Sequence, residues 1–228
     1  MISLERMVVA SQDFTNPHVV RAVTAVKPTV SVTLPSAKEI AAFHDSCVTR
    51  AAWVHEQQRY TEGLWAPIEV NHRCNSLLWK EEDQARRRDV PETAIAANKR
   101  AIDSYNQIRN DAVERIDERL LAELRNIERS PESRLNSETA GAMIDRLSIL
   151  SLKIHHMRKQ TRRQDVSEAH RKACGEKLAR LRVQRTDLMQ CLDELLTDAL
   201  AGRAYFKVYR QFKMYNDPAL NPYLHGRD

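Results

Sequence analysis

Acidic, basic and amide side chains recur in this sequence at positions where an α-helix should carry apolar ones. On one segment, Glu138, Asp145 and His156 fall within about 20° of one another, because successive helical residues turn by about 100°. Ile149 and Leu152 share this face. Two carboxylates and an imidazole on a half-apolar face are costly to bury unless they are paired or bind something. The pattern therefore indicates an interior polar site or a structural network.

Two other segments carry the same kind of face. The polar residues on these faces and their margins are Asn75, Trp79, Glu82, Asp83 and Arg86 on one segment, and Asn106, Arg109, Asn110 and Asp117 on the other. Three consecutive segments that direct such groups toward a common interior are the main reason to expect a functional site. Buried Asn, Arg and Asp also fix register in long helical bundles, so a purely structural role remains an alternative.

The residue types favour phosphate chemistry. Carboxylates hold Mg²⁺, which also binds substrate phosphates, and the candidate metal ligands are Glu82, Asp83, Asp117 and Glu138. Basic groups would neutralise phosphate and His156 would act as acid or base; the candidate catalytic residues are Asp145, His156, Arg146, Lys153 and Arg109. The candidate substrate-binding residues include Asn75, Trp79, Arg86, Asn106, Asn110 and Lys213.

The sequence shares some features with the residue patterns of two kinds of helical enzyme. Glu114-x-x-Asp117 matches the second half of the E-x-x-E and E-x-x-D pattern of all-α NTP pyrophosphohydrolases, but no E-x-x-E precedes it in the second helical segment. A metal-free helical enzyme of the chorismate-mutase kind, which uses Arg, Lys and Gln against a dicarboxylate, is the other alternative. Neither pattern by itself defines the reaction.

Helical periodicity predicts the elements that position these residues. Residues 1–35 are expected to form an irregular arm, because Pro17, Pro28 and Pro35 forbid a continuous helix. Five long helices should follow, at about residues 36–58, 67–88, 91–128, 137–163 and 165–202. Short connections between long helices make neighbours antiparallel. We therefore predict an all-α, up-and-down bundle in which residues 36–228 form a single domain.

The last helix and the segment after it have distinct patterns. Leu181 and Leu188 lie on the clearest apolar seam of the sequence and are expected in the core. Aromatic and basic residues alternate from Arg203 onward. We interpret this segment as a strap that packs over the bundle rather than as a nucleic-acid stacking platform.

Composition limits the class of protein. Among 228 residues, 36 Lys and Arg face 31 Asp and Glu, for a net charge of +5. Acids interrupt every basic run, which permits an anionic small molecule and disfavours nucleic acid. The four cysteines form no C-x-x-C pair and are expected to be reduced thiols. The sequence has neither a signal-peptide pattern nor the run of about 18 apolar residues of a membrane span, so a cytoplasmic protein is expected.

Four blocks of sequence resemble the signature of a known family. They are Asn75 to Asp83 (N-S-L-L-W-K-E-E-D), Arg109-Asn110-Asp111, Glu138 to Leu150 (E-T-A-G-A-M-I-D-R-L-S-I-L) with Lys153 and His156, and Gln211 to Pro218 (Q-F-K-M-Y-N-D-P). Over residues 38–223 the chain is similar to an uncharacterised bacterial family of all-α proteins, a domain of unknown function. The last block adds Tyr215 and Asn216 to the candidate binding residues. The resemblance implies no established activity, but relatives are often encoded near glycosyltransferases of cell-surface polysaccharide assembly.

Two functional hypotheses follow. The first is an enzyme, or enzyme subunit, that acts on a phosphorylated or nucleotide-linked metabolite in cell-surface polysaccharide assembly, with a divalent metal such as Mg²⁺ as a possible cofactor. The alternative is a non-catalytic helical adaptor that docks on a glycan-assembly enzyme. In the first case the acids should converge around a water-filled pocket, and in the second they should pair off inside the protein. The sequence does not define an oligomeric state.

Overall fold

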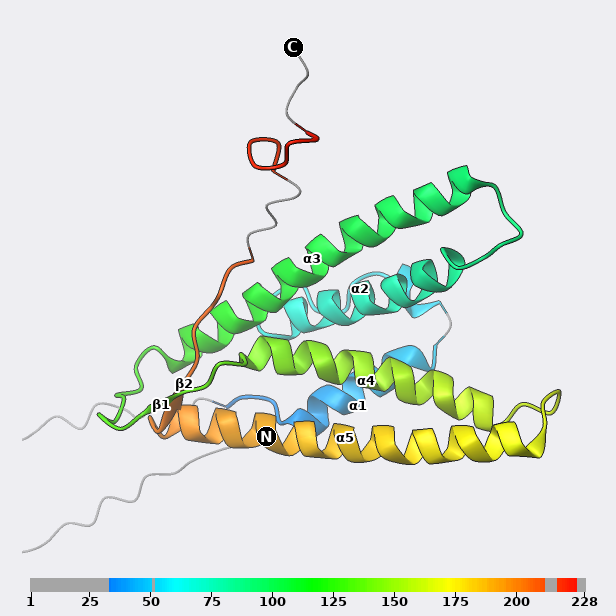
Figure 1. The fold of residues 1–228 in the computed structure, drawn as a ribbon. Coiled ribbons are helices and arrows are strands. Elements are labelled where there is room, and N and C mark those ends of the chain that lie inside the picture. Colours follow the sequence, from blue (N-terminus) through cyan, green and yellow to red (C-terminus); the bar gives the residue numbers. More distant parts are fainter. Residues whose placement is uncertain (1–32, 51, 212–216, 225–228) are drawn as a thin grey trace, which may run out of the picture.

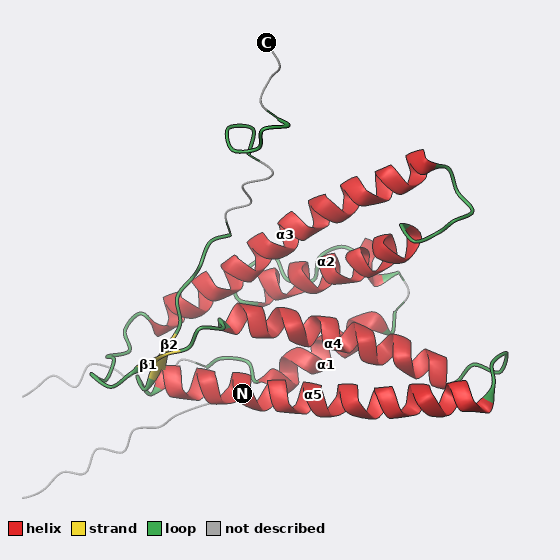
Figure 2. Ribbon diagram, in the orientation of Figure 1, coloured by secondary structure: helices red, strands yellow, loops and turns green. Residues whose placement is uncertain are grey.

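The structure is a computed structural model and describes residues 33–50, 52–211 and 217–224. Nearly all of the expected N-terminal arm lies outside the described residues. Within them the chain forms five α-helices: α1 (Ala37–Val48), α2 (Trp65–Gln84), α3 (Glu92–Leu124), α4 (Ala140–Thr161) and α5 (Glu168–Leu200). The other elements are a 3-10 helix, η1 (Trp53–His55), and the two-residue strands β1 (Arg134–Leu135) and β2 (Ala204–Tyr205). The prediction of an all-α bundle is confirmed (Figure 2).

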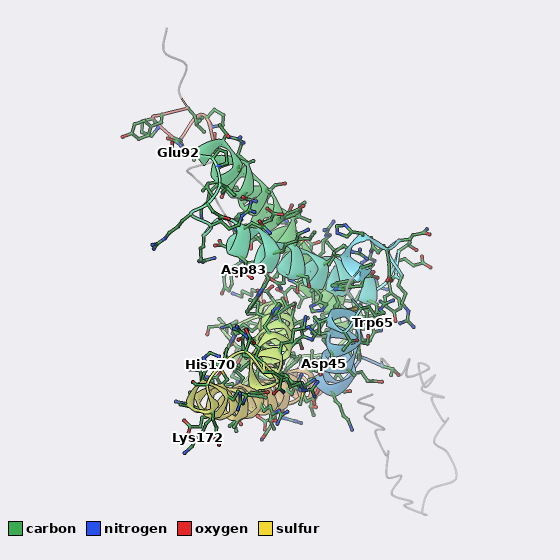
Figure 3. The ribbon with its side chains drawn as sticks, turned by 90° about the vertical axis from the view of Figure 1, so that its right-hand side faces the viewer. Asp45, Trp65, Asp83, Glu92, His170 and Lys172 are labelled. Carbon is green, nitrogen blue, oxygen red and sulfur yellow. The ribbon has the colours of Figure 1, made fainter. Side chains whose placement is uncertain are left out.

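Two antiparallel hairpins make up the bundle. Helix α2 packs along α3, and α4 packs along α5 (Figure 1). The short α1 packs on α4 and α5 and lies to one side of the two hairpins in Figure 3. None of the described helices has the length and apolarity that crossing a membrane requires.

Polar caps fix where several helices begin. Ser36 and Glu39 form a capping box at α1, in which each side chain accepts a backbone N–H of the other residue. Thr139 caps α4 through the N–H of Ala142. Helix α5 begins at Glu168, after the cap Ser167, a few residues later than the predicted start at 165. Because a helix end needs such acceptors, caps place these boundaries more closely than apolar periodicity does.

The first helix is shorter than predicted. It ends at Val48 rather than near residue 58, and η1 lies in the loop that leads to α2. Arg73 on α2 donates through Nη1 to three carbonyl oxygens of this loop, those of Trp53, Val54 and Glu56. Glu69, one turn earlier and paired with Arg73 at 2.9 Å, accepts the backbone N–H groups of Arg59 and Tyr60. These contacts satisfy loop backbone groups that a longer helix would have satisfied internally.

Leucine and isoleucine side chains from all five described α-helices fill the core. Its fully buried members include Ile40, Ile116, Leu120, Ile144, Leu147, Leu192, Leu195 and Leu196. Leu188 is buried with them, as predicted. Leu181 is only half-buried, because it lies where α5 borders a cavity instead of the core.

The segment after α5 folds back over the bundle. Strand β2 pairs in parallel with β1, and the residue that follows it, Phe206, is buried in the core. Arg210 then contacts two acids of α3, with Nη1 3.0 Å from Glu114 and Nη2 2.6 Å from Glu118. The predicted strap is therefore confirmed for its described first part, residues 203–211.

The different surroundings of Leu188 and Leu181 predict different costs of truncation. Leu188→Ala should lower the free energy of unfolding by about 2–5 kcal/mol, because the surrounding core only partly closes around the missing atoms. Leu181→Ala, two turns away on the same helix, should cost less, because its side chain already borders open space. Urea denaturation of both variants measures the difference. A larger loss for Leu181→Ala would show that the core boundary on α5 is misplaced.

Candidate functional site

The polar faces of α2 and α4 meet inside the bundle, around Asp145. Its Oδ1 accepts hydrogen bonds from the side-chain amides of Asn71 (2.7 Å) and Asn75 (2.8 Å). The Nε of Arg109, on α3, lies 4.0 Å from the same oxygen. The Asp145 side chain is 15% exposed. Two amide donors and one cation therefore offset the hydration that this carboxylate loses.

A hydrogen-bond chain continues from this carboxylate toward α1. His72 Nε2 lies 3.1 Å from the carbonyl oxygen of His44, which can only accept, so Nε2 carries the proton. His72 Nδ1 must then accept from the hydroxyl of Ser148, 2.7 Å away. That hydroxyl oxygen in turn accepts from Asn75 at 3.0 Å. The direction of every bond is fixed, and the chain requires a neutral His72.

Aromatic rings stack beside this chain. The ring of His44 lies 4.4 Å from that of His72, and the ring of Trp53 lies 5.0 Å from it. His44 is fully buried and neither of its ring nitrogens has a hydrogen-bond partner among the described residues. Burial lowers the pKa of His72 to about 3 and holds the pKa of His44 well below its usual range. Both imidazoles are therefore neutral in the folded protein.

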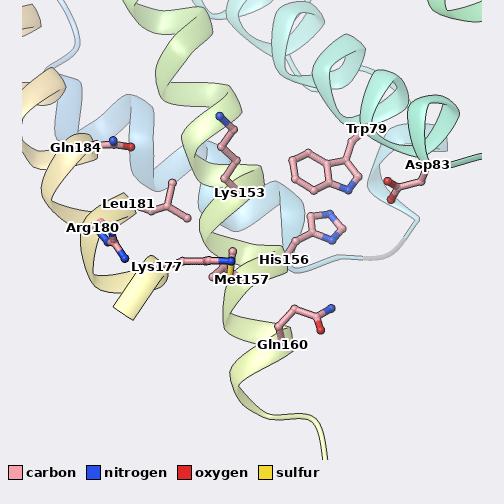
Figure 4. A pocket seen from close by; sticks show the side chains of 10 residues that line it. All are labelled: Trp79, Asp83, Lys153, His156, Met157, Gln160, Lys177, Arg180, Leu181 and Gln184. Atoms are coloured by element: carbon pink, nitrogen blue, oxygen red, sulfur yellow. The ribbon is translucent and has the colours of Figure 1, made fainter. Parts of the chain in front are cut away.

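A cavity of about 660 Å³ opens farther along α2 and α4, where α5 also contributes. Trp79 of α2 stacks on His156 of α4, with ring centroids 4.4 Å apart and planes 9° from parallel. Figure 4 shows Trp79 and Asp83 reaching from α2, and Lys177 and Arg180 from α5. The volume is in the range of small-molecule sites.

The electrostatics of this cavity favour an anion. Three cationic side chains, Lys153, Lys177 and Arg180, line it against the single carboxylate of Asp83. None of the three cations forms an ion pair with another described residue. Burial, followed by the nearby positive groups, lowers the pKa of His156, so the imidazole is neutral near pH 7. A neutral His156 can stack, donate or accept, and the cations remain available to a ligand.

The predicted metal ligands lie in separate places. Glu82 pairs with Arg86 on the surface, Glu138 pairs with Arg146, and Asp83 lines the cavity. Asp117 accepts the backbone N–H of Gly141 at 2.7 Å and so caps α4, and burial raises its pKa to about 6. The described residues contain no group of three or more His, Cys, Asp or Glu that would hold a metal ion.

The structure divides the other predicted site residues into two groups. Asn75, Asp145 and Arg109 meet in the polar network, with Asn110 nearby donating to Gln211 of the strap. Trp79, Lys153 and His156 meet in the cavity. Arg86 and Arg146 are exposed and paired with acids of their own helices or loops. Asn106 is half-buried on α3, and Lys213, Tyr215 and Asn216 lie outside the described residues.

Sequence reasoning missed several members of both groups. Asn71 and His72 stand one turn before Asn75 on α2, so the same helical-face argument would have found them. Ser148 was inconspicuous because a lone serine on a helix is common. Lys177 and Arg180 lie on the outer face of α5, where charged side chains normally point into solvent and have no specific role. They become part of a cavity wall only because α4 lies between α2 and α5 and the cavity spans all three helices.

Residues 65–208 match the family described as "Protein of unknown function (DUF4254)". The chain belongs to this family. The DUF4254 region contains the cavity and the Asp145 network, whereas His44 and the rest of α1 lie before it. No curated protein and no solved structure matches the chain significantly.

The Asp145 geometry predicts that the acceptor oxygen matters more than the charge. Asp145→Asn should lower the free energy of unfolding by about 1 kcal/mol or less, because its amide oxygen still accepts from both asparagines, and Arg109, 4.0 Å away, makes no hydrogen bond to the carboxylate that would be lost. Asp145→Ala should cost about 2–4 kcal/mol, because two buried amide groups lose an acceptor. Urea denaturation compares them. Equal losses would mean that the negative charge is the stabilising feature.

The buried histidines predict a specific pH dependence. The pKa of His72 falls from 6.5 when unfolded to about 3 when folded, so its contribution to stability is complete above about pH 6.5 and is lost as the pH falls toward 3. Each such histidine adds a slope of about 1.4 kcal/mol per pH unit. In His72→Gln the slope of unfolding free energy between about pH 6 and 4 should be shallower by that amount.

The raised pKa of Asp117 acts in the opposite direction over the same interval, but equally in both proteins, so it cancels in the comparison. Urea denaturation at each pH provides the measurement. Identical slopes for the wild type and His72→Gln would show that His72 is protonated in the folded protein or exchanges its proton without cost.

Proposed function

We propose that this protein binds a nucleotide-linked sugar, or a similar phosphorylated metabolite, in the cavity between α2, α4 and α5. The observation that carries the proposal is the cavity wall itself, which combines an aromatic pair with three cations that have no ion-pair partner in the described part of the chain. A nucleobase stacks on Trp79 or His156, as bases do on exposed aromatic rings. Lys153, Lys177 and Arg180 neutralise the diphosphate through charge-assisted hydrogen bonds.

We further propose that the protein acts in the cytoplasm as an enzyme, or enzyme subunit, of bacterial cell-surface polysaccharide assembly. The similarity of its sequence blocks to a family whose members are often encoded near glycosyltransferases supports this context. Within the cavity, burial lowers the pKa of His156, so its imidazole is neutral near pH 7 and can accept a proton from a bound ligand. Asp83 is the carboxylate available to a ligand-bound Mg²⁺, since Mg²⁺ is commonly held by one or two carboxylates plus substrate phosphates.

A specific observation favours the alternative, a non-catalytic adaptor. Most of the predicted site acids are satisfied by partners inside the chain, including Glu138 by Arg146 and Asp117 by the N–H of Gly141. That pattern is expected when polar residues set helix register rather than assist chemistry. In this reading the basic end of α4, with Arg158 and Lys159, contacts a glycan-assembly enzyme. Charge reversal at Lys159 should then abolish co-purification with the glycan-assembly enzyme and leave nucleotide affinity unchanged.

Arginine substitutions on α5 test the binding proposal directly. Isothermal titration calorimetry with UDP, UDP-glucose, GDP and GDP-mannose should find at least one ligand. Arg180→Ala should weaken its affinity by about tenfold or more, the effect of losing a hydrogen bond to a charged group. Both Arg180 and the control position Arg182 are exposed, so neither substitution should alter stability by more than about 0.5 kcal/mol.

Arg182→Ala is the matched control, because Arg182 is an exposed residue of the same type on the same helix that does not line the cavity. Two residues along a helix turn its side chain by about 200°, to the opposite face. Affinity should be unchanged in this variant. Failure of all four ligands to bind, or equal effects of the two substitutions, would contradict the proposal.

A further inference from the structure

A second cavity continues from the first along the groove between α4 and α5. It has a volume of about 520 Å³, and its lining includes Lys153 and Gln184, which also line the first cavity. Figure 4 shows these two side chains together at the end of the first cavity away from Gln160. The shared residues make the two cavities neighbouring compartments of one groove.

The two compartments differ in charge. The first carries three cationic side chains against one carboxylate. In the second, Glu138 and Asp187 balance Arg146 and Lys153, above a floor of aliphatic side chains. Lys153 lies at the boundary and belongs to both compartments, so beyond it the lining has two carboxylates against one guanidinium. The groove therefore runs from a cationic end to an end without an excess of cations. A ligand with a negative end and a neutral end would be oriented by this difference.

The polar groups of the second compartment suit hydroxyl groups. Carboxylates and amides both form hydrogen bonds with hydroxyls, and a carboxylate bond is the stronger because it is charge-assisted. The Glu138 carboxylate lies 2.6 Å from Nη1 of Arg146 and is therefore paired. The side chain of Asp187 makes no ion pair or hydrogen bond with another described residue. Asp187 and Gln184 are therefore the polar groups that a neutral polyhydroxylated ligand would meet.

We propose that the second compartment is the sugar subsite: the nucleoside diphosphate lies against Trp79, Lys177 and Arg180, and the linked sugar passes Lys153 and Gln184 to reach Asp187. This inference rests on the proposed function and adds the direction in which the ligand lies. Lys153, at the boundary of the two compartments, contacts the phosphate that carries the sugar. The orientation places the sugar, rather than the base, over the α4–α5 seam.

A cysteine of this chain reports on occupancy of the second compartment. Cys191 lines it and is exposed, whereas Cys47, Cys74 and Cys174 are buried. Burial also raises the pKa of the thiols of Cys47 and Cys74, which disfavours the reactive thiolate. N-ethylmaleimide should therefore modify Cys191 first, and Cys191→Ser identifies that reaction by mass spectrometry.

The experiment compares protection of Cys191 by a nucleoside diphosphate and by its sugar-linked form, each at a concentration that saturates the site in calorimetry. UDP-glucose or GDP-mannose should slow the modification several-fold, and UDP or GDP should leave its rate unchanged. Equal protection by both forms, or protection by neither form when both bind, would overturn the sugar-subsite assignment and leave the proposed function standing. If neither form binds, the proposed function fails and this assignment fails with it.

A substitution tests whether the sugar contacts the second compartment directly or whether ligand binding protects Cys191 through a conformational change. Asp187→Asn should weaken binding of the sugar-linked form by about tenfold, as expected for a charge-assisted hydrogen bond, and leave the free diphosphate unaffected. Glu176→Gln is the control, because it removes an exposed carboxylate from α5 outside both compartments. An equal loss for both ligand forms in Asp187→Asn would show that Asp187 acts on the phosphate end, contrary to the assignment.

Discussion

The carboxylate of Asp145 is the constraint on which the α2–α4 interface depends. A charge that has lost most of its hydration must be offset, and here Asn71 and Asn75 of α2 donate hydrogen bonds to it while the cation of Arg109 on α3 lies 4.0 Å away. Because amide hydrogen bonds tolerate little displacement, they fix how α2 lies along α4. One turn beyond Asn75 on α2 and about three turns beyond Asp145 on α4, the same alignment stacks Trp79 on His156. The interior network thus positions one wall of the cavity.

The opposite wall depends on apolar packing. Leu188, Leu192 and the later leucines of α5 are buried against the other helices, so that end of α5 is held close. Toward its beginning α5 borders the cavity, where Leu181 is only partly covered. Lys177 and Arg180, although exposed, therefore line the same cavity as Trp79. One face of α5 is packed through Leu178 and Leu188, and the neighbouring face borders the cavity; this placement turns a surface charge pattern into part of a binding site.

The acids of this protein serve mainly its architecture. Asp117 caps α4, and the close approach of Gly141 to the carbonyl of Val113 leaves no space for a larger residue at that helix start. Glu114 holds the strap, and Glu69 orders the loop before α2. These carboxylates make structural contacts away from the cavity. The cavity itself therefore has few acidic groups and more cations than acids. That balance suits recognition of a phosphorylated ligand better than a site built around several carboxylates and metals.

The sequence by itself determined the helices, their approximate limits and the presence of polar groups on interior faces, because helical periodicity and caps are local and repeat within a few residues. It also pointed to Asn75, Asp145, Arg109, Trp79 and His156. Only the tertiary structure decided which of them meet. Asn71 reaches Asp145 across 74 residues of chain, and Arg180 becomes a cavity residue through the placement of α5. Such pairings depend on the relative positions of whole helices, which no local pattern encodes.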